Sequence, residues 1–142
     1  MDSGSDDDSV ALLAIKPRFA EAIIAGRKTV EFRKTRFSQP PRYVVLYAST
    51  PIRQIVAYFE VAYIKELTPL GLWRKFRHVG GIEYDEFFQY YGDRSRGCAI
   101  VVATVWKLKR PACLGHLHPR GSAPQSFRYL NASSIRRLSE RH

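Results

Sequence analysis

The pattern of apolar and polar positions predicts a strand followed at once by a helix near the start of the chain. Residues 10–16, which are apolar as far as Ile15 and end in Lys16, are typical of a short buried strand. Pro17 suits the first turn of a helix, and we expect that helix to end at Ala25. Gly26 follows where a left-handed cap would close it.

Residues 28–37 alternate between apolar and charged side chains. Val30 and Phe32 share one face of the predicted strand, whereas Glu31 and Arg33 share the other. The pattern therefore predicts a strand with one apolar and one charged face.

Three longer apolar runs, at residues 43–48, 55–64 and 98–109, predict further strands. Near-continuous apolarity in the first two indicates a barrel or a sheet that is covered on both faces. Strands and helices in this order describe one α+β unit.

Two helices are predicted before the last of these strands. The first begins at Thr68 and Pro69, and the Gly80–Gly81 pair interrupts the chain after it. Its expected apolar face carries Leu70, Trp73 and Phe76. The second begins near Tyr84, with Asp85 and Glu86 suiting its N-terminus. Its expected apolar stripe consists of Tyr84, Phe87, Phe88 and Tyr91.

Length and composition favour a single globular domain: the chain has 142 residues, 45% hydrophobic and 25% charged. We expect residues 1–9 to form a disordered acidic leader and residues 10–130 the folded domain. Residues 131–142 are expected to form a basic C-terminal helix or tail, with the helix over residues 134–140.

The charge balance favours a polyanionic partner. The net charge is +10, and four of the thirteen acids lie within the first eight residues, so the rest of the chain carries 23 cations against nine acids. Such an excess makes nucleic acid the leading class of partner and an anionic membrane surface a weaker second.

Several other classes lack support in the sequence. No run approaches the roughly 20 apolar residues of a membrane span, and the start lacks the features of a secretory signal, so we expect a cytoplasmic protein without a membrane partner. Cys98 and Cys113 are interpreted as reduced, packed thiols. His116 and His118 lack a third ligand nearby, so no metal is expected, and no cofactor motif is present.

The segment over residues 12–37 resembles the opening of the ASCH-domain family, a branch of the PUA-like superfamily. The defining string of that family, Gly-x-Lys-x-x-Glu-x-Arg, is intact here as Gly26, Lys28, Glu31 and Arg33. It follows a strand and a proline-started helix, which is the context that the family requires. The resemblance implies a small pseudo-barrel of five to six mixed strands with helices packed around a cleft. It also implies RNA or a modified nucleobase as the ligand.

The chemistry of this string can be argued from its residue types. Lys28 and Arg33 could hold a phosphate while the Glu31 carboxylate accepts from a base amino group. Strict alternation would place Lys28 on the opposite face, so the three converge only if the strand starts after Lys28. The competing interpretation is an ordinary ion pair on a solvated strand face.

The resemblance also bears on catalysis. Some members of the superfamily are amidohydrolases that act on acetylated cytidine, with a lysine after the same glycine, a threonine three residues later and a glutamate before the second helix. Lys28 matches, but Glu31 occupies the threonine position and Val79-Gly80-Gly81-Ile82 stands where the glutamate would fall. A hydrolase of RNA or of a modified nucleoside, using Lys28 with Glu31 or Glu83, stays open as the alternative.

Other residues are candidates for nucleic-acid contact. Ser49, Thr50 and Arg53 follow an apolar strand, at a position where a barrel rim commonly meets a ligand. Tyr90 is a candidate for stacking on a base. The remaining candidates are Lys16, Arg18, Ser126 and Arg128, the last two being brought to the site if Phe127 and Leu130 anchor the tail across the cleft.

Together these observations favour a module that binds single-stranded RNA or a nucleotide in a basic cleft. RNA is preferred to DNA because of the resemblance. The sequence leaves the oligomeric state open.

Overall fold

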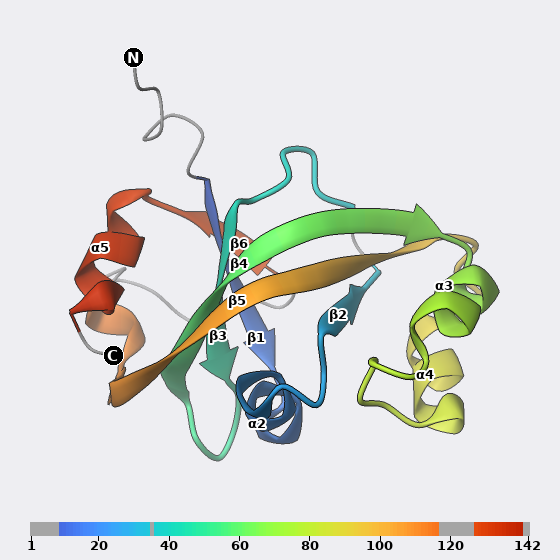
Figure 1. Ribbon diagram of the computed structural model, residues 1–142, viewed down its shortest axis with the longest axis horizontal. Coiled ribbons are helices and arrows are strands. Elements are labelled where there is room, and N and C mark those ends of the chain that lie inside the picture. Colours follow the sequence, from blue (N-terminus) through green and yellow to red (C-terminus); the bar gives the residue numbers. More distant parts are fainter. Residues whose placement is uncertain (1–8, 35, 117–126, 141–142) are drawn as a thin grey trace.

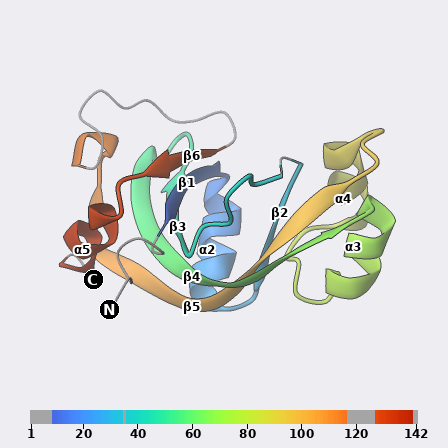
Figure 2. The same ribbon diagram turned by 90° about the horizontal axis from the view of Figure 1, so that it is seen from above.

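The computed structural model describes residues 9–34, 36–116 and 127–140. It contains a six-stranded mixed sheet in the order β2-β5-β4-β3-β1-β6, in which β1 and β3 are parallel and the other neighbours are antiparallel. The strands are β1 (Val10–Ile15), β2 (Val30–Arg33), β3 (Tyr43–Ala48), β4 (Gln54–Leu67), β5 (Gly97–Ala112) and β6 (Phe127–Leu130). The sheet curls into a half-barrel (Figures 1 and 2), so the predicted α+β fold is confirmed.

Four α-helices pack on this sheet: α2 (Pro17–Ala25), α3 (Pro69–Phe76), α4 (Tyr84–Tyr91) and α5 (Ser133–Ser139). A short 3-10 turn, η1 (Leu114–His116), follows β5. Figure 1 shows α5 at one end of the sheet and the α3–α4 pair at the other, with α2 between them. None of the described helices has the length and apolar character needed to cross a bilayer.

Local chemistry explains why α2 begins and ends where it does. Lys16 is extended at its N-cap, and Pro17 occupies the first turn, where a missing N–H costs nothing. Gly26 has φ +83° and donates its N–H to the last carbonyls of the helix. Both predicted boundaries are confirmed. The helix buries Ala20 and Ile23 against one face of the sheet.

Opposite faces of the sheet carry separate parts of the core. Ala11 and Leu13 of β1 face α2, whereas Val10 and Leu12 face the side on which Leu138 of α5 packs. A third cluster joins β2 and β5 to α3 and α4, with Phe87 at its centre. Since β1 is buried on both faces, its continuous apolar run needs no alternation.

Some details differ from the predictions. The strand expected over residues 28–37 is limited to Val30–Arg33, and its charged face is not solvated, since Glu31 is 5% exposed. Leu70 and Tyr84 are exposed although helical spacing placed them on apolar faces, and both lie in the first turn of their helices. Cys113 is exposed rather than packed, whereas Cys98 is buried.

The end of the chain contributes an edge strand that was predicted only as an anchor. Phe127 of β6 pairs with Leu13 of β1, and its ring lies 4.5 Å from that of Phe37. Leu130 packs on the opposite face of the sheet. The segment is therefore fixed along β1 and does not cross the cleft.

Candidate nucleotide cavity

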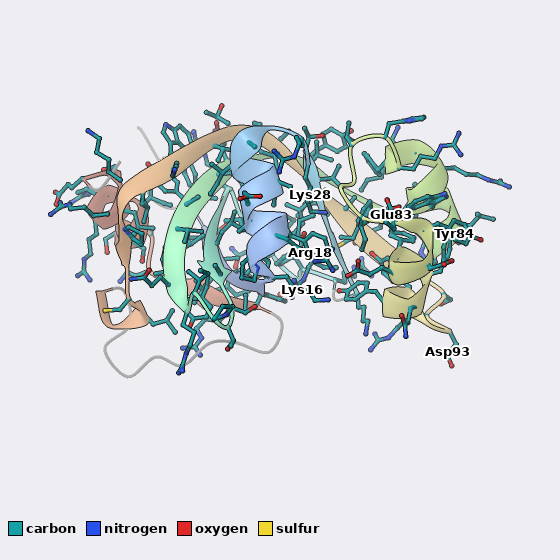
Figure 3. All side chains as sticks on the ribbon, turned by 90° about the horizontal axis from the view of Figure 1, so that it is seen from below. Lys16, Arg18, Lys28, Glu83, Tyr84 and Asp93 are labelled. Carbon is teal, nitrogen blue, oxygen red and sulfur yellow. The ribbon has the colours of Figure 1, made fainter. Side chains whose placement is uncertain are left out.

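A cavity of about 400 Å³ opens between α2, β2 and α4, within the usual size range of small-molecule sites. Its charged lining consists of Lys16, Lys28, Glu31, Arg33 and Glu86. Its apolar and neutral lining consists of Ala14, Ile15, Phe19, Phe32, Ile82, Gln89 and Tyr90. Figure 3 shows Lys16, Arg18 and Lys28 along the side of α2 that faces the segment beginning at Glu83.

The residues of the Gly-x-Lys-x-x-Glu-x-Arg string converge in this cavity. Because the strand begins at Val30, Lys28 lies before it and is not bound to the opposite face by strand alternation. Its Nζ lies 3.7 Å from Oε1 of Glu31. Arg33 donates from Nη1 to Oε2 of the same carboxylate at 3.2 Å. Glu31 is thus shared by two cations. The interpretation as a solvated surface ion pair is wrong, because all three side chains are buried or nearly so.

Lys28 is 2% exposed, which is rare for a lysine. Its Nζ donates to the carbonyl oxygen of Gly80 and lies 4.9 Å from the ring centroid of Phe19 and 5.3 Å from that of Phe32. Burial lowers the pKa of Lys28 below its ordinary value, and the neighbouring Glu31 only partly offsets this effect. A lysine with a lowered pKa beside a carboxylate is a common feature of functional sites.

The Gly80–Gly81 turn covers Lys28, although the sequence suggested only an interruption. Its chain is tied to the start of β2 by a hydrogen bond from Thr29 N to Val79 O at 2.9 Å. Gly81 has φ +61°, and a Cβ there would lie 2.9 Å from Cβ of Lys28. The segment that lacks the amidohydrolase glutamate thus supplies a carbonyl group to the lysine instead of a carboxylate.

A second ion-pair group lies at the edge of the cavity. The Glu86 carboxylate accepts from Nζ of Lys16 at 3.2 Å and from Arg18. The Arg18 guanidinium is the main cause of the lowered pKa of Glu86. These bonds connect the start of α2 to α4 and are partly exposed. Sequence reasoning missed Glu86, which had been interpreted only as a helix N-terminal acid.

Tyr90 lies between the cavity and the end of β2. Its hydroxyl oxygen accepts the backbone N–H of Lys34 at 3.1 Å, and Nζ of Lys34 lies 4.7 Å from its ring centroid. Desolvation by burial raises the pKa of Tyr90. The ring is therefore held in one place as a wall of the cavity.

Other predicted site residues lie elsewhere. Ser49, Thr50 and Arg53 form the turn between β3 and β4, and they do not line the cavity, although Ser49 N donates to the carbonyl of the lining residue Ile15. Arg128 pairs with Leu12 of β1 and does not line the cavity. Ser126 lies outside the described residues, as do His118 and residues 1–8 of the acidic leader. Glu83 is exposed and does not line the cavity.

The cavity lining is nearly balanced in charge. Three cations, Lys16, Lys28 and Arg33, face two carboxylates, Glu31 and Glu86. The expected basic cleft is thus a cavity with a small cationic excess. Within the described residues, no group of three or more potential His, Cys, Asp or Glu metal ligands comes together.

Comparison with known proteins places this geometry in context. The family model for the ASCH domain matches residues 13–111. The ASCH domain-containing ribonuclease of Zymomonas mobilis is 24% identical over 137 residues, covering 93% of this chain and 91% of that protein. The ATP synthase subunit alpha of Ureaplasma parvum is 24% identical over 120 residues, covering 84% of this chain but only 15% of that protein.

The fold is also found in a solved structure. The crystal structure of ASCH from Zymomonas mobilis superposes with a TM-score of 0.85 at 22% identity, covering 94% of this chain and 96% of that one. The two chains therefore share the half-barrel fold.

Replacing Gly81 by alanine tests the contact with Lys28. We expect Gly81→Ala to lower the free energy of unfolding by about 1 kcal/mol or more beyond the loss in Gly26→Ala. Both glycines have positive φ, which costs roughly 1–2 kcal/mol for other residues, but a Cβ at Gly26 would meet nothing within 4 Å. Urea titration of both variants measures the difference, and equal losses would contradict the close approach.

The pKa of Lys28 predicts how stability depends on pH. Since this pKa is lowered in the folded chain, the unfolded chain holds more protons between the lowered value and 10.5. The contribution of Lys28 to the free energy of unfolding therefore rises with pH in that window. In urea titrations from pH 7 to 9.5, the free energy of unfolding of wild type should rise relative to that of Lys28→Met. Lys75→Met, which changes an exposed lysine, is the control. If the difference in free energy of unfolding between wild type and Lys28→Met stays constant or falls with pH, the pKa of Lys28 is not lowered.

Proposed function

Since the chain belongs to the ASCH domain family, we propose that it acts on RNA by taking one unpaired nucleotide of a single strand into the cavity between α2, β2 and α4. The observation that carries this proposal is the convergence of buried Lys28 and Glu31 with the half-buried Arg33 in a cavity with aromatic walls. The ribonuclease named among the relatives supports RNA as the partner, in preference to DNA.

The lining suits the two halves of a nucleotide. Glu31 can accept hydrogen bonds from a base amino group, and Arg33 can donate to a base carbonyl or ring nitrogen. Phe19, Phe32 and Tyr90 offer ring surfaces against which a base can pack. Polar groups buried in this way penalise a base that leaves them unpaired, so they would also provide selectivity.

The edge of the cavity suits the phosphate. Lys16 and Arg18 are more than half exposed and are held by Glu86, so a phosphate can exchange with that carboxylate without exposing the core. The net charge of +10 adds attraction that does not depend on sequence. Contact of Ser49, Thr50, Arg53 and Arg128 with a longer strand stays a prediction.

Binding can be tested with Tyr90. We expect Tyr90→Leu to weaken binding of a single-stranded RNA 8-mer about tenfold, because loss of base–aromatic stacking costs roughly 1–3 kcal/mol. Tyr90→Phe keeps the ring and should stay within about twofold of wild type. Fluorescence anisotropy at fixed salt measures both. If Tyr90→Leu binds the RNA as tightly as wild type, the nucleotide does not bind against Tyr90 in this cavity.

Hydrolysis of RNA is the second candidate, favoured by the buried Lys28 with its lowered pKa. In its neutral form this amine could take the proton of a ribose 2′-hydroxyl. The oxygen would then attack the adjacent phosphorus to form a cyclic phosphate, and the 5′-oxygen would leave with the proton returned from Lys28, while Arg33 balances the charge that develops. Water would then open the cyclic phosphate, which completes the hydrolysis.

A cleavage assay separates the two candidates. If the protein is a hydrolase, Lys28→Met should slow cleavage of end-labelled single-stranded RNA at least 100-fold, since general-base catalysis contributes about 10²–10⁴. Binding of long RNA should persist, and Lys75→Met should cleave like wild type. If stoichiometric wild-type protein forms no product, hydrolysis is excluded and binding remains the proposed function. Identification of nucleic acid that copurifies without added nuclease would name the ligand.

A further inference from the structure

A second cavity, of about 240 Å³, lies beside the nucleotide cavity at the end of β2. It is lined by Lys34, Arg36, Glu66, Arg96, Gly97 and Cys98. Its charged lining comprises three cations and one carboxylate, so it has a larger cationic excess than the nucleotide cavity. None of these residues was a candidate in the sequence.

The three cations come from segments that the fold brings together. Lys34 and Arg36 follow β2, whereas Arg96 directly precedes β5, the strand that pairs with β2. Figure 1 shows the end of β2 on the same side of the molecule as the end of β4 and the start of β5. Antiparallel pairing of Arg33 with Cys98 fixes this proximity.

Glu66 arranges the cations around the opening. Its Oε2 lies 3.2 Å from Nε of Arg36, and its backbone carbonyl accepts from Nη2 of Arg96 at 3.4 Å. Arg36 remains 80% exposed, so this pair is a weak surface interaction that an anion can replace at little cost. Two guanidinium groups at one opening match the geometry of a phosphate.

Lys34 connects the two cavities. Its side chain lines the second cavity, while its Nζ lies over the ring of Tyr90, a wall of the first. A strand whose nucleotide lies against Tyr90 thus has a neighbouring phosphate on the side of Lys34.

We propose that Lys34, Arg36 and Arg96 form a subsite for the backbone phosphate of the nucleotide that adjoins the one in the main cavity. This inference rests on the proposed function and adds the direction in which the RNA strand leaves: over Tyr90 and along the end of β2. The subsite holds the strand without reading its bases.

The test compares ligands that reach one cavity or both. The double variant Arg36→Gln/Arg96→Gln is titrated with a single-stranded RNA 8-mer and with the nucleoside 5′-monophosphates at several salt concentrations. We expect affinity for the 8-mer to fall about five- to tenfold at 0.1 M salt. The slope of log K against log salt should fall by about 0.7, since one phosphate contact on a single strand contributes about that amount. Affinity for the best-bound monophosphate should stay within twofold.

A matched control removes the same charge elsewhere. Lys109→Gln/Arg136→Gln changes two exposed cations, one near the end of β5 and one on α5, and should keep most of the affinity and slope. Figure 1 shows the end of β5 and α5 on the side of the molecule opposite to α3 and α4. An equal loss in both double variants, or no loss in Arg36→Gln/Arg96→Gln, overturns the subsite while monophosphate binding still supports the main cavity. If wild type binds neither probe, the proposed function fails and the subsite fails with it.

Discussion

Burial of the Lys28 ammonium group is the constraint on which the site depends. A charge taken out of water costs several kcal/mol unless it is paired and hydrogen-bonded. Lys28 meets this requirement with the Glu31 carboxylate, the Gly80 carbonyl and two aromatic rings. These partners come from three places in the chain, so the lysine joins α2, β2 and the turn before α4. The cavity is the space that these elements leave around it.

Under the proposed function, the charges of the protein are divided between two roles. In the nucleotide cavity, cations and carboxylates nearly balance, which suits recognition of a polar but uncharged base edge. The excess that makes the chain basic lies largely outside this cavity, on exposed arginine and lysine side chains such as Arg36 and Arg96. Exposed cations attract a polyanion over a distance and from any sequence, whereas buried groups discriminate between bases. This division accords with a protein whose exposed cations first attract an RNA strand and whose cavity then binds one of its nucleotides.

Much of the fold followed from local patterns because local physics decides them. A proline and a glycine bound α2, and long apolar runs form the strands buried at the centre of the sheet. The predictions failed in the first turns of helices, as at Leu70 and Tyr84, because helical spacing says which residues share a face but not which of them other elements cover. The edge strand β6 is only four residues long and gave no periodic signal.

Local spacing after a capped helix was enough to assign Lys28, Glu31 and Arg33 to one motif. The folded chain was needed to show that the strand starts late enough for Lys28 to join the other two. Tertiary structure also brought Glu86 and the Gly80 carbonyl to the site and left Ser49, Arg53 and Arg128 outside the cavity. These outcomes depend on strand register and helix packing between residues more than 50 positions apart, and no spacing along the chain records such contacts.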